Sequence, residues 1–103
     1  MAQKLDQRIN ERMPVMIVAE LRWGMARSAF ARVRDISSGG MRIACLRRLQ
    51  PGRWIEIRLP HGDWISARVV WRHARLIGLR FRKPIDPACA LGLQADRAPL
   101  AVA

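Results

Sequence analysis

Six short segments of alternating hydrophobicity constrain the fold of this chain more than any other feature. The clearest runs from Arg53 to Leu59, where Ile55, Ile57 and Leu59 alternate with larger polar or aromatic residues. This period of two is typical of a strand with one buried face. Similar patterns, separated by turn residues, predict further strands over 15–23, 27–36, 40–45, 64–72 and 76–82. They predict an all-β fold, a small six-stranded antiparallel barrel, because closure removes exposed sheet edges.

A short C-terminal helix is predicted after the last strand. Asp86 is a favourable N-cap, and Pro87 suits the first helical position. This helix is expected to cover one open end of the sheet with Ala88, Cys89, Leu91 and Leu93. The predicted organisation is therefore a flexible arm over 1–13, a barrel with its helix over 14–94, and a frayed tail over 95–103.

The alternation also assigns side chains to the two faces of the barrel. Trp23 and Trp71 are predicted to lie in the core, whereas Trp54 and Trp64 are predicted to point outward, where they could form a patch for a partner or be covered by the helix. The arginines expected on the outer face are Arg32, Arg34, Arg58, Arg68, Arg72 and Arg80.

Composition and isolated motifs limit the classes of function. The formal net charge is +11, from 19 lysines and arginines against 8 acidic residues, which predicts an anionic partner such as a nucleotide, a nucleic acid, an acidic protein or a membrane surface. Cys45 and Cys89 are expected to be free thiols packed as small hydrophobes in a reducing cytoplasm. No membrane span or signal peptide is recognised, and no nucleophile motif, Walker loop, metal cluster or carboxylate pair. We therefore expect a binding protein without a cofactor or metal, and not an enzyme.

The stretch from Arg34 to Met41 contains Asp35-Ile36-Ser37-Ser38-Gly39-Gly40 between two predicted strands. Asp35 and Ser37 should share one face of the extended chain, and the two glycines permit positive φ and close approach of a ligand. A carboxylate accepts from guanine or guanidinium N–H groups, and a hydroxyl donates or accepts. The alternative is an ordinary hairpin whose Asp and Ser cap the turn.

A second motif lies in the predicted arm, where Arg8 and Arg12 form R-x-x-x-R. Guanidinium groups are planar forks that suit phosphate. The two motifs in this order, about two dozen residues apart and followed by a β-rich remainder, resemble the PilZ domain, a family of bacterial receptors for cyclic di-GMP. The segments 69–71 and 77–81 are similar to the last strand pair of that family.

The resemblance implies a six-stranded barrel with a C-terminal helix and a cyclic di-GMP site, with an effector protein as partner. It assigns the arm arginines to guanine edges and phosphates, and the second motif to the other side of the base. The residues implied are Arg8, Arg12, Asp35, Ser37 and Gly40, with Gln7, Ser38, Gly39 and Arg80 as further candidates. Gln7 departs from the arginine that many members carry there, which puts binding of two stacked ligand molecules in doubt.

Two other functions remain open from the sequence. A basic barrel with exposed aromatic residues could bind RNA or DNA, and a PilZ-like protein could serve as an interaction module without binding ligand. The presence of both motifs favours the cyclic di-GMP receptor. The process that such a receptor controls is not encoded in these motifs.

Overall fold

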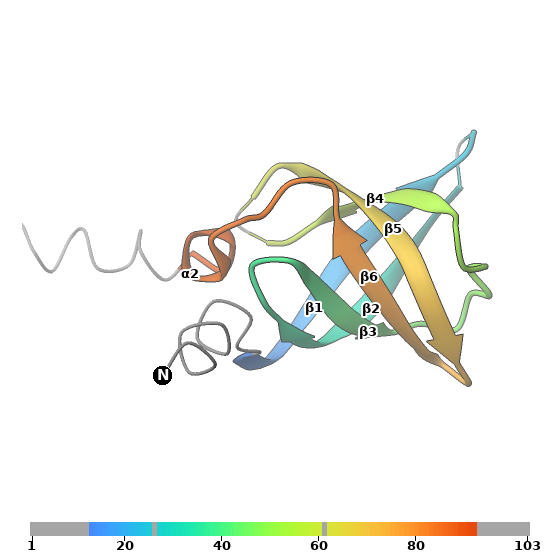
Figure 1. The fold of residues 1–103 in the computed structure, drawn as a ribbon, viewed down its shortest axis with the longest axis horizontal. Helices are drawn as coiled ribbons and strands as arrows, with labels where there is room; N and C mark the ends of the chain where they lie inside the picture. Colours follow the sequence, from blue (N-terminus) through green and yellow to red (C-terminus); the bar gives the residue numbers. More distant parts are fainter. Residues whose placement is uncertain (1–12, 26, 61, 93–103) are drawn as a thin grey trace, which may run out of the picture.

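The computed structural model describes residues 13–25, 27–60 and 62–92. Six strands close into an antiparallel barrel in the order β1-β2-β3-β6-β5-β4 (Figure 1). Their bounds are β1 Met13–Trp23, β2 Arg27–Ile36, β3 Gly40–Ala44, β4 Trp54–Arg58, β5 Trp64–His73 and β6 Leu76–Phe81. The predicted six-stranded barrel is confirmed, and β1 begins one residue inside the segment predicted as the arm.

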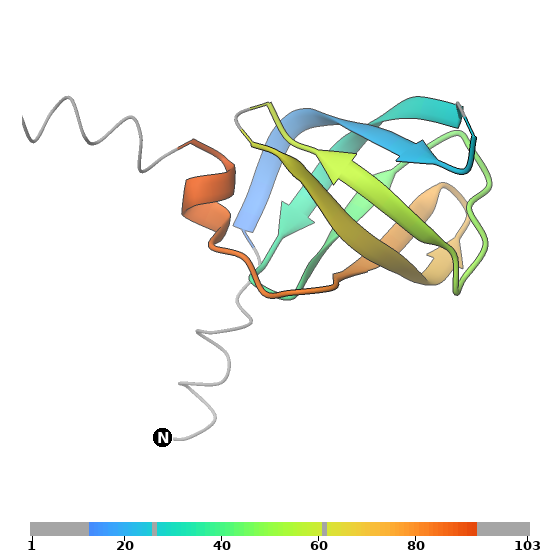
Figure 2. The same ribbon diagram turned by 90° about the horizontal axis from the view of Figure 1, so that it is seen from above.

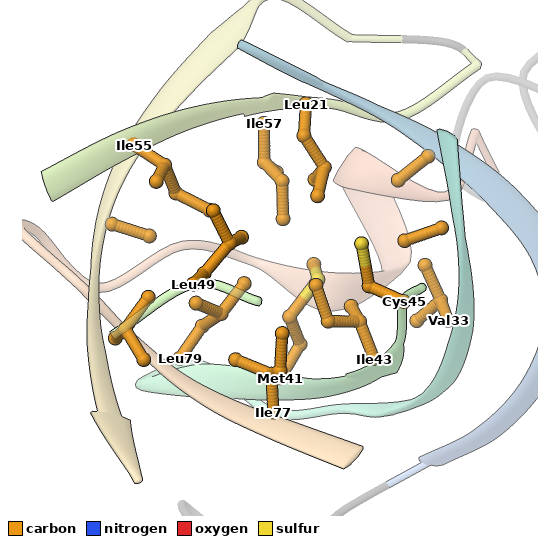
Figure 3. Packing of buried hydrophobic residues seen from close by; sticks show 14 of the residues in the cluster. Leu21, Val33, Met41, Ile43, Cys45, Leu49, Ile55, Ile57, Ile77 and Leu79 are labelled. Carbon is orange, nitrogen blue, oxygen red and sulfur yellow. The ribbon is translucent and has the colours of Figure 1, made fainter. Parts of the chain in front are cut away.

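The core is formed by inward residues from all six strands, most of them at positions that alternation predicts (Figure 3). Leu21, Val33, Ile43, Ile57 and Ile77 are fully buried. Leu49, from the connection between β3 and β4, is also buried, so the connection closes part of the barrel interior. This continuous core fixes the strands that carry the polar residues of the outer surface.

The helix α2 Pro87–Ala90 lies beside one end of the barrel, near the start of β1 and the β2–β3 turn (Figures 1 and 2). We call this the helix end; the β1–β2, β3–β4 and β5–β6 connections lie at the opposite, far end. The predicted cap is confirmed, since the Asp86 side chain accepts a 3.1 Å hydrogen bond from the Ala88 backbone N–H. Ile85, Ala90 and Leu91 pack against the core.

Two details of the sequence interpretation differ, since one needs correction and one falls outside the described residues. Cys45 is buried as predicted, but Cys89 is exposed, because Ala90 and Leu91 form the apolar side of the short helix. Leu93 lies outside the described residues. Within the described ranges, no helix combines the length and the hydropathy needed to cross a bilayer.

The outward tryptophans do not form one patch. Trp54 lies opposite Arg68 and Trp64 opposite Arg58 on the β4–β5 ladder. The two rings are therefore four positions apart, about 13 Å at the usual strand rise. The Arg22 guanidinium lies 3.8 Å from the centroid of the Trp64 ring, and an arginine also stacks on Trp54. Each ring thus has an arginine stacked on it, although Trp54 remains 48% exposed, and neither a joint patch nor the helix covers the pair.

A bulge in β5 overturns the prediction that Trp71 is a core residue. The register shifts between Val69 and Trp71, so Val70 is an extra residue and Trp71 pairs with Gly78 on the outer side. Trp71 is 37% exposed, and its indole covers Gly78 so closely that a Cβ there would lie 2.2 Å from the ring nitrogen. The same shift places Arg72 opposite the buried Ile77, so Arg72 turns toward the inner side and not outward as predicted.

Candidate ligand-binding site at the helix end of the barrel

The β2–β3 hairpin turns the acidic residue of the sequence motif away from the barrel core, although its side chain is nearly buried. Val33 points into the core, and regular alternation would send Asp35 inward as well. A register shift between these two residues makes Arg34 an extra residue, so Ile36 points inward instead. Asp35 and Ser37 therefore flank a core residue on the side away from the core, which confirms that they share a face.

Asp35 forms an ion pair with Arg42 on the neighbouring strand. Arg42 Nε donates to Asp35 Oδ2 at 2.7 Å, and Arg42 Nη2 donates to the same oxygen. The carboxylate side chain is only 8% exposed, whereas that of Arg42 is 44% exposed. The hydrogen bond and the negative charge of Asp35 raise the pKa of Arg42 above its ordinary value. A nearly buried carboxylate thus holds a charged, half-exposed guanidinium in a fixed orientation.

The turn between β2 and β3 is tied down by hydrogen bonds at both sides. Ser37 donates to the Gly40 carbonyl from its backbone N–H at 2.8 Å and from its hydroxyl at 3.3 Å. The Gly39 carbonyl accepts from Phe81 N–H at 2.8 Å, and the Ser38 carbonyl accepts from Ile85 N–H at 2.9 Å. The turn is therefore held against the segment that leads from β6 to α2, and the Ser37 side chain caps it.

Position 40 requires glycine because the neighbouring strand leaves no room for a side chain. A Cβ at Gly40 would lie 2.0 Å from the carbonyl oxygen of Leu79, because β3 and β6 approach closely at this point. Gly39 has no atom within 4 Å of the same position, so its outer side is open. Neither residue of this pair adopts positive φ, contrary to the expected use of the glycines, and the described glycines that do are Gly24, Gly52 and Gly92.

Arg80 extends the charged surface next to the hairpin. It is exposed on β6, as predicted, and pairs with Gly40 on one side and Arg68 on the other. Arg42 pairs with Gly78, which lies two positions from Arg80 along β6. Arg42 and Arg80 are therefore diagonal neighbours, roughly 7–8 Å apart by ladder geometry. Two guanidinium groups beside one carboxylate can bind an anion and orient a planar group that carries N–H donors.

The structure thus brings Asp35, Ser37, Ser38, Gly39, Gly40 and Arg80 together around one turn. Gln7, Arg8 and Arg12 lie outside the described residues. Among the residues that the structure covers, no group of three or more His, Cys, Asp or Glu side chains could hold a metal ion.

Arg42 is the site residue that the sequence interpretation missed. A two-residue turn at Ser38-Gly39 places Ile36 opposite Met41 and therefore Asp35 opposite Arg42. The turn length contained the signal for this pairing. Strand alternation did not, because the register shift at Arg34 is what turns Asp35 away from the core. The acidic motif residue and its basic neighbour form one charged unit.

Comparison with known proteins identifies the family and the fold. The family model described as the PilZ domain matches residues 6–91. A similar solved structure is the crystal structure of the PilZ domain of CeSA from a cellulose-synthesizing bacterium. It superposes with a TM-score of 0.59 at 17% sequence identity, covering 89% of this chain and 97% of that chain. No curated protein matches the sequence. At this identity the structural likeness concerns the fold, whereas the family model spans both motifs.

Proposed function

Because the chain belongs to the PilZ domain family, we propose that it is a cytoplasmic receptor that binds cyclic di-GMP at the helix end and signals to a partner protein. The observation that carries the proposal is the rigid β2–β3 hairpin, which fixes Asp35 and Arg42 beside Arg80. These groups offer an acceptor for guanine N–H groups and cations for phosphate. The proposal requires binding and a change of surface, with no reaction on the ligand.

The path of the chain supports a contribution from the arm. Met13 pairs with Ile36, so β1 starts directly beside the residues of the second motif. Arg12 precedes Met13 in the sequence, and one peptide unit spans 3.8 Å between Cα atoms. An arginine side chain at this position can therefore reach the hairpin, and Arg8 is four residues further along the arm.

We assign the following roles on this basis. Arg8 and Arg12 contact guanine edges and phosphates. Asp35 orients Arg42 and accepts from guanine where ligand approaches its carboxylate, while Ser37 and Gly40 hold the turn in shape. Gln7, in place of an arginine, favours one ligand molecule over a stacked pair.

Signalling is proposed to follow from ordering of the arm. Residues 1–12 are polar and lack an apolar period, so binding would supply their main contacts. Amide hydrogen exchange with and without cyclic di-GMP tests this step. Protection of residues 5–12 is expected to rise with ligand. Protection that is already high in the free protein, or that stays low at saturation, contradicts the switch.

An exposed apolar patch supports the effector part of the proposal. Met16, Val18 and Phe30 on the outer face of β1 and β2 are 91%, 55% and 71% exposed. Large exposed apolar side chains on neighbouring strands, here next to Arg32 and Glu20, are a feature of protein interaction sites. The patch lies on the strand into which the arm leads, so a partner could contact the patch and the ordered arm together.

The binding proposal is tested with Arg12→Ala. Loss of one charge-assisted contact should weaken cyclic di-GMP binding about ten- to hundredfold. Arg22 is an unsuitable charge control, since it pairs with Glu56 at 2.7 Å and stacks on Trp64. Arg32→Ala is the better control, because Arg32 is exposed on β2 and has no ion pair within the described part of the chain. Equal losses in both variants would show that general charge attraction, as in nucleic-acid binding, dominates.

A second variant tests the role of the carboxylate. Asp35→Ala should reduce the preference for cyclic di-GMP over cyclic di-AMP, because adenine lacks the N1–H donor and the exocyclic amino group of guanine at C2. An unchanged ratio of the two affinities, in a variant that melts cooperatively, would remove Asp35 from base recognition. If neither dinucleotide binds the wild type, the interaction-module alternative is preferred.

A further inference from the structure

The far end of the barrel carries a basic hollow that the cyclic di-GMP proposal does not use. Its volume is about 550 Å³, and it lies between the 45–48 segment and the β5–β6 turn. The basic residues that line it are Arg47, Arg48, Arg72, His73 and Arg75. None of the described residues in the lining is acidic. We call this site the basic hollow.

Arg72 has a feature that an ordinary surface arginine lacks. The Val70 bulge turns it toward the inner side of β5, opposite the buried Ile77. Its Nε is buried and is the one buried side-chain polar atom without a hydrogen-bond partner within the described residues. Buried donors are nearly always paired, so the charge of Arg72 is poorly satisfied by the described residues around it.

The loops that form the basic hollow are held together. Cys45 N–H donates to the Arg75 carbonyl at 2.9 Å, and Arg47 N–H donates to Cys45 Sγ at 3.4 Å. The Arg47 guanidinium also lies 5.9 Å from the centroid of the Trp23 ring. The backbones that carry the arginines are thus fixed by the barrel, which lowers the entropy cost of binding.

The charge of the hollow is not balanced by nearby ion pairs. The ion pairs within the described ranges are Arg22–Glu56, Arg42–Asp35 and Arg58–Glu20, and none of these residues lines the hollow. A smaller hollow of about 290 Å³ shares Arg48 and is also lined by Arg27 and Arg53. The whole far end is therefore strongly cationic, and an anion there would relieve repulsion among the guanidinium groups.

We propose that the basic hollow is a second ligand site, specific for a small polyphosphate group such as a pyrophosphate moiety. Four guanidinium forks can bind two adjacent phosphate groups, because each fork matches two phosphate oxygens. Arg72 is the partly buried member of this set, and the exposed Arg47, Arg48 and Arg75 close around the ligand. A single phosphate would leave much of the volume and charge unused.

The test is an isothermal calorimetric titration of the full chain with pyrophosphate, at low and at physiological ionic strength. Saturable binding is expected, weakened about ten- to hundredfold by Arg72→Gln and by Arg75→Gln. Arg32→Gln removes the same charge outside the hollow and should have little effect. Arg75 is exposed in a turn, so its variant keeps the test valid if Arg72→Gln perturbs folding.

Further experiments identify the source of the phosphate and distinguish the basic hollow from the cyclic di-GMP site at the helix end. The same variants should leave cyclic di-GMP binding at the helix end unchanged, and saturating cyclic di-GMP should not displace pyrophosphate. Vesicles with an anionic phospholipid and an unrelated oligonucleotide serve as the other phosphate sources. If these bind through Arg72 and Arg75 while pyrophosphate does not saturate, the small-ligand proposal is overturned. Equal losses in all three variants would overturn it as well.

Discussion

Substitution of Gly40 by alanine should destabilise the barrel strongly, although it adds only one methyl group. The new Cβ would lie 2.0 Å from the Leu79 carbonyl oxygen, whereas ordinary contacts begin at 3.4 Å, so the backbones of β3 and β6 must separate by 1.4 Å. This movement strains the Gly40–Arg80 pairing and the 2.8 Å hydrogen bond from Phe81 N–H to the Gly39 carbonyl. Overpacking and weakened hydrogen bonds together cost about 3 kcal/mol.

Thermal unfolding followed by circular dichroism measures this effect. A loss of about 3 kcal/mol lowers the melting temperature of a domain of this size by roughly 12–24 °C. Gly39→Ala is the matched control, because its Cβ meets no atom within 4 Å and its φ is not positive. That variant should stay within about 1 kcal/mol of the wild type. Equal effects of the two substitutions would refute the close approach of β3 and β6.

Three further substitutions test other contacts by urea unfolding. Arg42→Ala should cost about 1–2 kcal/mol, because it removes an ion-pair partner of the nearly buried Asp35 carboxylate. Asp35→Asn in the same chain should recover part of the loss, and no recovery would contradict the coupling of the two residues. Arg72→Met should stabilise the protein by about 1 kcal/mol, because it removes an unpartnered buried donor. A loss of stability would mean that Arg72 Nε has a hydrogen-bond partner in the folded protein. Gly78→Ala should shift tryptophan emission to the red and lower the free energy of unfolding by about 1–2 kcal/mol, because it displaces the Trp71 indole. Unchanged emission would mean that the Trp71 ring does not cover Gly78.

Strand alternation predicted the barrel because most of its positions follow a strict period of two. The prediction failed at Trp71 and Arg72 for one shared reason, the extra residue Val70 in β5. A bulge inverts the inward and outward assignment of the residues that follow it, and no single residue type marks its position. A similar shift at Arg34 aims Asp35 outward. The Asp35 site and the basic hollow therefore both depend on register shifts, which the period of two in the sequence does not predict.

The candidate site was predictable as a set of residues but not as a set of contacts. Turn composition identified Ser37 and Gly40, yet their observed roles are a cap and a close backbone approach, which follow from pairing with β6. The ion pair of Asp35 with Arg42 depends on hairpin register, which the turn length specifies once the two-residue loop is known. The contribution of Arg8 and Arg12 stays a prediction, since both lie outside the described residues.

The most direct test of the account is equilibrium titration of the purified chain with cyclic di-GMP, with cyclic di-AMP and an unrelated oligonucleotide as competitors. The account predicts saturable binding of one cyclic di-GMP per chain that an excess of either competitor does not displace. Displacement by the oligonucleotide, or equal affinity for the two cyclic dinucleotides, would contradict a guanine-selective site formed by the arm and the β2–β3 hairpin.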